Sequence, residues 1–210
     1  MSLADIRREY PGEPLDEAHV DADPFRQFNR WFERIREDGA DPTAMALATT
    51  SRDGHPSVRM VLLKELDERG FVFYTNYESR KARDLAETGL ASLLFYWPSV
   101  TRQVRVEGTV EKVTAGESDA YFASRPLDSR IAASISPQSE PIASRLVLDT
   151  RFEQARAING DSDPPRPAFW GGYRVVPAQM EFWQGRPNRL HDRLRYTRRD
   201  GVWSIERLAP

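Results

Sequence analysis

The sequence of 210 residues contains no cysteine, and its three histidines, His19, His55 and His191, are scattered. The lack of cysteine excludes disulfides, thiolate metal sites and cysteine nucleophiles, and the histidine spacing gives no metal triad. The signatures GxGxxG, HExxH and GxSxG and the Walker loop are absent too. We therefore predict no metal site and none of the enzyme classes that depend on those motifs.

Neither charge nor hydropathy points to a nucleic acid or a membrane. The net charge is −2, with 30 basic and 32 acidic residues, so no overall field attracts polyanions. No apolar run approaches the roughly 18 residues of a membrane span, and the polar N-terminus does not resemble a signal peptide. We expect a cytoplasmic protein without nucleic-acid or membrane partners.

The pattern along the chain predicts one domain preceded by an arm. Residues 1–22 are polar and hold two prolines, so we expect a mobile N-terminal arm and a single domain over residues 23–210. Pro24 opens a predicted helix that Gly39 ends, and its apolar stripe predicts core packing. The stripe consists of Phe25, Phe28, Trp31, Phe32 and Ile35.

Most of the remaining chain has the short alternating runs and turn signals of antiparallel strands. Strands are predicted at residues 44–50, 57–66, 71–75, 91–97, 102–113, 172–176, 179–183, 191–197 and 202–208. Helices are predicted near residues 79–88, 116–124, 128–134 and 141–158. Closing the sheet removes exposed edges, so the expected fold is mainly β: a closed or nearly closed antiparallel barrel with flanking helices.

The most informative segment is Met180 to Arg193, which contains Arg-Leu-His-Asp-Arg. If this segment is extended, Arg189, His191 and Arg193 share one face. Such groups repel one another unless something anionic or electron-rich lies against them. The segment therefore suggests half of a site for a phosphorylated planar ligand, although a solvated strand face remains the alternative.

Two more segments place cations where an anion would stabilise them. Arg80 and Lys81 lie in the first turn of a predicted helix, where an anion would offset their repulsion by the helix dipole. Arg59 and Lys64 lie at opposite ends of an apolar strand. The alternatives are a solvated surface helix and ordinary extension of long side chains into water at strand ends.

Tyr121, Arg125 and Ser129 form a further candidate phosphate site, because a hydroxyl, a guanidinium and a helix start converge there. The alternative is a corner between helices in which Arg125 pairs with Asp128. Amides at positions 103 and 138 can pair with the edge of a heteroaromatic ring. With no nucleophile–base pair in sight, the set suits redox chemistry by a bound phosphorylated cofactor.

In this order the motifs resemble those of the pyridoxine/pyridoxamine 5′-phosphate oxidases. Besides segments 59–64, 79–81, 138–139 and 180–193, the resemblance rests on Arg7-Arg8-Glu9-Tyr10, Asp41-Pro42-Thr43-Ala44-Met45, Phe73-Tyr74-Thr75-Asn76, Ser124-Arg125-Pro126, Phe169-Trp170-Gly171-Gly172 and Arg207-Leu208-Ala209-Pro210. It implies an α+β split β-barrel, a homodimer, and FMN held between the subunits. It also implies oxidation of both phosphorylated vitamers to pyridoxal 5′-phosphate by hydride transfer to FMN, with O2 as acceptor and H2O2 as product.

The resemblance also implies residue roles. The implied FMN contacts are Arg59, Met60, Val61, Leu62, Leu63, Lys64, Tyr74, Thr75, Arg80, Lys81, Gln103, Gln138, Ser139, Trp183 and Arg193. The implied substrate contacts are Arg7, Tyr10, Lys64, Tyr121, Arg125, Ser129, Arg189, Leu190 and His191. Asp41, Arg189 and His191 are the implied catalytic residues, and we expect His191 to be largely neutral between its arginine neighbours.

The sequence departs from the family pattern at Ile131-Ala132-Ala133-Ser134 and at Pro137, which puts substrate preference and any secondary product site in doubt. Two rival functions remain open. One is an oxidase of the phenazine-pathway type, acting on an unphosphorylated ring. The other is a non-catalytic flavin- or haem-binding module.

Overall fold

The computed structural model describes residues 2–5, 9–10, 12–37, 39, 41–160 and 162–210. The helices are α1 (Pro24–Glu37), α2 (Arg80–Thr88), α3 (Ala115–Ser124), α4 (Leu127–Ile135) and α5 (Arg145–Asn159), with short 3-10 turns at Leu3–Asp5 and Pro187–Arg189. The strands are β1 (Ala44–Thr50), β2 (Pro56–Leu62), β3 (Glu65–Asp67), β4 (Gly70–Asn76), β5 (Leu90–Trp97), β6 (Arg102–Lys112), β7 (Trp170–Gln184), β8 (Asp192–Arg199) and β9 (Val202–Arg207).

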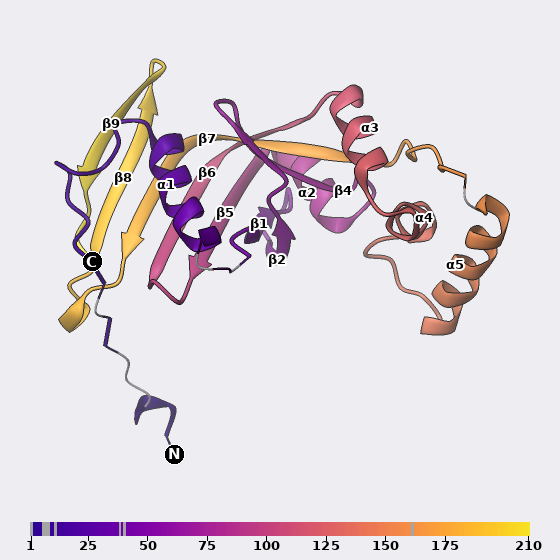
Figure 1. Ribbon diagram of the computed structural model, residues 1–210, viewed down its shortest axis with the longest axis horizontal. Helices are drawn as coiled ribbons and strands as arrows, with labels where there is room; N and C mark the ends of the chain where they lie inside the picture. The colour runs from indigo at the N-terminus through magenta and orange to yellow at the C-terminus, as the bar shows by residue number, and fades with distance from the viewer. Residues whose placement is uncertain (1, 6–8, 11, 38, 40, 161) are drawn as a thin grey trace.

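All strands join one antiparallel sheet that curls into a half-barrel (Figure 1). Its order is β2-β1-β5-β6-β7-β4-β3, and β8 and β9 extend it beside the C-terminal half of β7. This arrangement confirms the predicted class, a mainly antiparallel β fold with flanking helices. In Figure 1, α3, α4 and α5 lie at the opposite end of the molecule from β8 and β9.

Helix α1 covers the sheet through the predicted aromatic stripe. Phe28 is fully buried, with its ring 5.1 Å from that of Phe71 and 4.9 Å from that of Phe95. The Trp31 ring meets Phe182 at 5.2 Å. These edge-on aromatic contacts join α1 to β4, β5 and β7, so the main core lies between the helix and the sheet.

Two predicted strands, 172–176 and 179–183, are one long strand in the structure, and this prediction was wrong. Pro177 interrupts the alternating pattern, but the strand continues through a β-bulge: Glu107 of β6 pairs with Gln179 and Gly108 with Pro177, so Ala178 of β7 is the extra residue. A side chain at Gly108 would lie 2.0 Å from the Val176 carbonyl oxygen, so the close approach requires glycine. The strand predicted at 57–66 is divided into β2 and β3, and the helix predicted from residue 141 starts at Arg145.

The side chain of Glu117 connects the start of α3 to the sheet through hydrogen bonds. Its Oε2 accepts hydrogen bonds of 2.7 Å from both the backbone and the hydroxyl of Thr114, while its Oε1 lies 3.1 Å from the buried guanidinium of Arg174. The hydrogen bonds from Thr114, assisted by Arg174, lower the pKa of Glu117 to about 2. The carboxylate therefore stabilises the fold only while it is ionised.

We expect Glu117→Gln to lower the free energy of unfolding at pH 7 by about 1–3 kcal/mol, because it removes the charge that Arg174 and the helix cap require. The deficit relative to wild type should shrink as pH falls below about 4.5, where the unfolded carboxyl takes up its proton and wild type loses the same contribution. Urea denaturation at pH 7 and pH 3 measures this. Glu111→Gln, 3.8 Å from Arg174 and half-exposed, is the matched control. An equal deficit at both pH values would contradict the prediction.

Candidate active site

A first cavity of about 480 Å³ brings together residues that the sequence analysis assigned separately to cofactor and substrate. It lies between β2, β4, α2 and the α3–α4 corner. The lining residues are Arg59, Met60, Val61, Leu62, Lys64, Tyr74, Thr75, Lys81, Tyr121, Arg125, Gln138 and Trp170. Of these only Trp170 was assigned no role, although it lies in the motif Phe169-Trp170-Gly171-Gly172.

Lys81 is the central cation of the first cavity. Its Nζ donates to Gln138 Oε1 at 2.8 Å and to Thr75 Oγ1 at 3.2 Å, both neutral groups. Burial, and then the nearby charge of Arg59, lower the pKa of Lys81 to about 8. The N-cap of α2, Ser79, is fully buried and makes no side-chain capping bond. A partly buried ammonium beside an uncapped helix start is an arrangement that a phosphate would stabilise.

Arg59 reaches back over β1 instead of into water. Its guanidinium donates to the Leu47 carbonyl at 3.1 Å, the Thr49 hydroxyl at 2.8 Å and the Ser57 hydroxyl at 2.7 Å. Burial lowers its pKa, and the charge of Asp84 opposes that effect. The described contacts of Arg59 with oxygen are all to neutral atoms, so its charge adds to the positive field of the cavity.

Three aromatic rings of the first cavity are stacked nearly parallel to one another. The Tyr74 ring stacks on Tyr121 at 4.0 Å and on Trp170 at 5.5 Å, with interplanar angles of 17° and 10°. Burial raises the pKa of Tyr74 to about 12, so its hydroxyl stays protonated. A Cβ at Gly172 would approach the Tyr74 ring to 2.8 Å, so glycine at this position allows the ring to lie against β7.

Arg125 has an unsatisfied buried nitrogen. Its guanidinium carbon lies 4.8 Å from the centre of the Trp170 ring, and its NH1 is buried without a hydrogen-bond partner among the described residues. Asp128, the alternative partner, lies 3.2 Å from Arg156 instead. Burial lowers the pKa of Arg125. Because an unpaired buried donor costs about 1–3 kcal/mol, this geometry favours an anionic ligand in the cavity.

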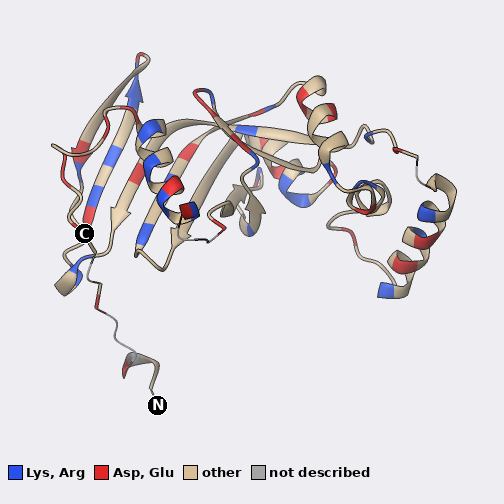
Figure 2. Ribbon diagram, in the orientation of Figure 1, with Lys and Arg blue, Asp and Glu red and all other residues tan. Residues whose placement is uncertain are grey.

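A second, smaller cavity of about 230 Å³ lies on the other half of the sheet and is lined by Gln103, Arg105, Glu181, Trp183, Arg193 and Pro210. Strand register explains the grouping, since Gln103, Trp183 and Arg193 are direct neighbours across β6, β7 and β8. Figure 2 shows the basic residues along β8. The anionic group beside Arg193 is Glu181, which accepts hydrogen bonds of 2.8 and 3.1 Å from it. These hydrogen bonds raise the pKa of Arg193.

The predicted alternation of Arg189, His191 and Arg193 on one strand face is wrong at its first residue. Residues 187–189 form a 3-10 turn, Arg189 has a left-handed φ of 63°, and β8 begins only at Asp192. Leu190 is 69% exposed, so its side chain makes little contact within one chain.

His191 lies beside the second cavity. The backbone N–H of Arg186 donates to His191 Nδ1 at 3.1 Å, which assigns the proton of a neutral ring to Nε2. Burial, and then the charge of Arg189, lower the pKa of His191, in the predicted direction. The His191 ring lies 4.6 Å from Trp183 and 5.6 Å from Tyr10.

Several predicted site residues lie outside these cavities. Asp41 is exposed, and hydrogen bonds from the hydroxyl (2.7 Å) and backbone (2.9 Å) of Thr43 lower its pKa. Leu63 is buried in the core. Arg80, Ser129 and Ser139 do not line the first cavity, and Arg7 lies outside the described residues. Their assigned roles stay predictions.

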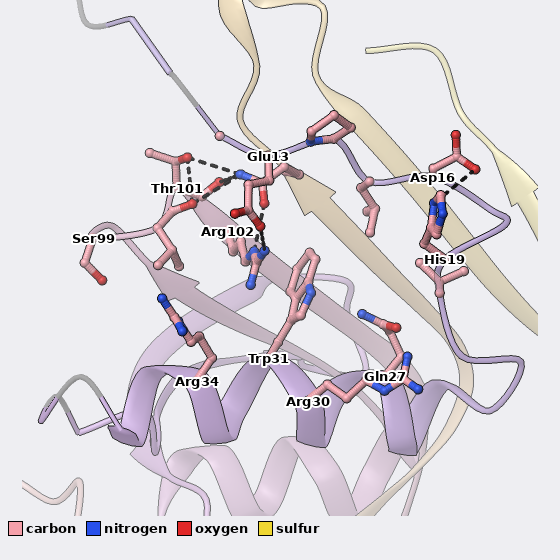
Figure 3. Close-up of a pocket in the computed structure, with 16 residues that line it drawn as sticks. Glu13, Asp16, His19, Gln27, Arg30, Trp31, Arg34, Ser99, Thr101 and Arg102 are labelled. Carbon is pink, nitrogen blue, oxygen red and sulfur yellow. Dashed lines mark hydrogen bonds and ion pairs between the residues drawn. The ribbon is translucent and has the colours of Figure 1, made fainter.

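A third cavity, of about 660 Å³, was missed by the sequence analysis (Figure 3). It lies between the N-terminal segment, α1 and the turn from β5 to β6. Arg102 crosses its floor, with its guanidinium 4.5 Å from the centre of the Trp31 ring and its Nε donating to Gln184 Oε1 at 2.7 Å. No short-range pattern signals this cavity, because its walls come from segments far apart in the sequence.

Within the described part of the chain, no three His, Asp or Glu side chains are grouped so that they could hold a metal ion. None of the described helices combines the length and the hydrophobicity needed to cross a membrane.

Comparisons with known proteins match both parts of the chain. Residues 32–159 match the family model described as pyridoxamine 5′-phosphate oxidase, and residues 170–210 match the pyridoxine 5′-phosphate oxidase C-terminal dimerisation region. A pyridoxine/pyridoxamine 5′-phosphate oxidase of Burkholderia multivorans is 57% identical, with 100% of this chain and 99% of that protein covered. One of Trichormus variabilis is 54% identical at the same coverage.

Solved structures show the same fold. PhzG from Burkholderia lata 383, in complex with tetrahydrophenazine-1-carboxylic acid, matches with a TM-score of 0.88 and 33% identity over 95% of this chain and 99% of PhzG. A pyridoxamine 5′-phosphate oxidase-related, FMN binding protein from Nostoc punctiforme has a TM-score of 0.74 over 91% of this chain and 100% of that one, with 18% identity. These likenesses confirm the predicted split-barrel architecture.

Proposed function

The chain belongs to the pyridoxamine 5′-phosphate oxidase family, and we propose that it binds FMN and oxidises pyridoxine 5′-phosphate and pyridoxamine 5′-phosphate to pyridoxal 5′-phosphate, with O2 as acceptor and H2O2 as product. Residues 23–210 would form the oxidase domain, preceded by an N-terminal arm of residues 1–22. The observation that carries the proposal is the buried NH1 of Arg125, which finds no hydrogen-bond partner in the part of the chain that the structure describes and shares one cavity with Lys81.

The residues of the first cavity fit FMN. Lys81 and the start of α2 would hold its phosphate, and the β2 segment with Thr75 and Gln138 would contact the rest of the cofactor. When bound, FMN supplies a two-electron acceptor for a hydride from the substrate carbon. The protein supplies position and electrostatics, as the lack of a nucleophile–base pair predicts.

Arg125 and Tyr121 would bind the phosphate of the substrate. The Arg125 guanidinium is fixed over Trp170 and has a free donor, so a phosphate oxygen would satisfy it without reorganisation of the site. Lys64, which lines the same cavity, adds a second positive charge. Two anion positions in one cavity suit one phosphate on the cofactor and one on the substrate.

We propose that two copies of the chain complete each site. Trp170 lines the first cavity and Trp183 the second, and at about 3.3 Å per residue the strand between them spans roughly 40 Å. One chain therefore does not bring both sets of residues to one flavin. The match of residues 170–210 to a dimerisation region supports a homodimer in which the second cavity of one copy faces the first cavity of the other.

His191 and Arg189 would then reach the substrate from the second copy. The bond from the Arg186 backbone leaves His191 Nε2–H as a donor, which suits a substrate oxygen or ring substituent. A neutral imidazole at this position avoids repulsion by Arg189. Asp41 remains a predicted catalytic residue, although its carboxylate is exposed and bonded to Thr43.

The likeness to PhzG favours a second candidate, oxidation of a phenazine-type ring. The two candidates differ in the substrate phosphate. Adding each phosphorylated vitamer in air to the purified, flavin-loaded protein, with assays of aldehyde and peroxide, tests the first candidate. A yellow protein that produces neither from either vitamer would refute it.

A further inference from the structure

The N-terminal segment of residues 12–17, here called the arm segment, is docked on the C-terminal strands. The side chain of Leu15 is buried, at 7% exposure, and its backbone N–H donates to Asp192 Oδ2 at 3.1 Å. Arg207 donates to the Leu15 carbonyl at 2.9 Å and also pairs with Glu17. Side chains of β8 and β9 therefore hold this segment against the sheet.

Arg186 adds a contact at the beginning of the arm segment. Its NH1 donates to the Gly12 carbonyl at 2.8 Å, and its Nε lies 3.5 Å from Asp192 Oδ2. Asp192 is thus shared between Arg186, Arg207 and the Leu15 backbone. The Arg186 side chain therefore links Asp192, the neighbour of His191 in the sequence, to the backbone of Gly12.

Gln184 and Gly185 lie directly against the backbone of Gly12. A Cβ at Gly12 would lie 2.1 Å from Gln184 Nε2 and 2.4 Å from the Gly185 carbonyl oxygen, so only glycine fits. Gln184 is itself 1% exposed, and Arg102, on the floor of the third cavity (Figure 3), donates to its Oε1. The backbone of the arm at Gly12 is therefore held in one position when Arg186 donates to its carbonyl.

The position of the arm decides what covers His191. Tyr10 lies two residues before Gly12, and its ring meets His191 edge-on at 5.6 Å and Trp183 at 6.1 Å. Release of Gly12 would free Tyr10 from both rings. The backbone N–H of Arg186 bonds to His191 Nδ1, so one residue contacts both the arm and the imidazole.

We propose that Arg186 is a positioning residue, whose side chain holds the arm at Gly12 and so keeps Tyr10 packed on His191 while substrate is bound. The inference rests on the proposed function, since it assumes that His191 faces the substrate. Its consequence is specific. Loss of the Arg186 side chain should weaken retention of substrate, leaving the cofactor in place and the reacting groups unchanged.

Arg186→Met removes the guanidinium and keeps the aliphatic stem. In the FMN-loaded protein we expect hydrogen exchange at the Leu15 amide to quicken about tenfold, the order expected for one hydrogen bond to a charged group. KM for the phosphorylated vitamers should rise about tenfold, with kcat within about twofold and FMN affinity unchanged. Arg186→Lys, which can still donate to Gly12, should restore part of the slow exchange.

Arg195→Met is the matched control, because Arg195 lies on the neighbouring strand β8 but pairs with Glu206 away from the arm. It should change neither exchange nor KM. Unchanged exchange in Arg186→Met, or a fall in kcat with KM unaltered, would overturn the proposal. If the wild-type protein oxidises neither vitamer, the proposed function fails, while exchange at Leu15 still supports or overturns the contact between Arg186 and the arm.

Discussion

Replacing Lys81 by methionine will weaken FMN binding between about tenfold and a hundredfold at pH 7, the range expected when a phosphate loses a hydrogen bond from a charged group. The ammonium is already partly stripped of water and held by Gln138 and Thr75, so it needs little reorganisation to meet an anion. Methionine preserves the length of the side chain without the charge. Fluorescence titration of apoprotein with FMN measures the change.

The same lysine predicts a pH dependence. Burial and Arg59 set the pKa of Lys81 to about 8 in the ligand-free protein, and only the protonated form attracts phosphate. FMN affinity should therefore be constant from pH 7 to about 8 and fall as pH rises beyond it, while Lys81→Met shows no such fall. Arg83→Met, on the exposed side of the same helix, is the control for general loss of charge. A wild-type affinity independent of pH up to 9.5 would contradict this role.

Replacing Arg125 by methionine should raise KM for pyridoxine 5′-phosphate about a hundredfold, because it removes the donor that the substrate phosphate would satisfy. The unphosphorylated vitamers offer no anion, so their kcat/KM should stay within about twofold. The difference between the two substrate classes isolates the phosphate contact from any general damage. Steady-state kinetics with the two phosphorylated vitamers and with pyridoxine and pyridoxamine provides the measurement.

The stability of this variant offers an independent check. The buried NH1 of Arg125 has no hydrogen-bond partner among the described residues, so its removal should leave Tm unchanged within about 2 °C or raise it. Arg145→Met, at an exposed site on α5, serves as the control for loss of an arginine. Equal losses of kcat/KM for phosphorylated and unphosphorylated substrates would contradict the assignment of Arg125 to the substrate phosphate and favour a phenazine-type ring as substrate.

Local signals in the sequence predicted most elements well. Gly89 ends α2 with a left-handed φ of 67°, and the turns at Gly54 and Gly201 have φ values of 83° and 81°, where short-range chemistry determines the backbone. Pro177 misled the prediction because pairing with β6, far away in the sequence, carries the strand past it through a bulge at Ala178. The prediction that Arg189 lies on an extended strand was also wrong, because the sequence alone does not reveal the turn at residues 187–189.

The candidate site was only partly visible in the sequence. Arg125 was predicted as a phosphate ligand from its position before Pro126, and the structure adds a physical reason, a buried guanidinium nitrogen for which the described residues offer no hydrogen-bond partner. Trp170 and Glu181 were missed, because their importance comes from stacking on Tyr74 and from pairing with Arg193 across strands. Register between paired strands, which residue periodicity does not encode, decides both contacts.

Strand β7 carries Trp170 at one end and Trp183 at the other, so in a twofold assembly each copy would lend its two ends to two different catalytic centres. Defects at the two ends of the strand would then be separable. Consider a mixed dimer of one chain with a substitution near Lys81 and one chain with a substitution near Trp183. One of its catalytic centres would contain both substitutions, and the other would contain neither. Two inactive proteins would thereby rescue one another on exchange of subunits.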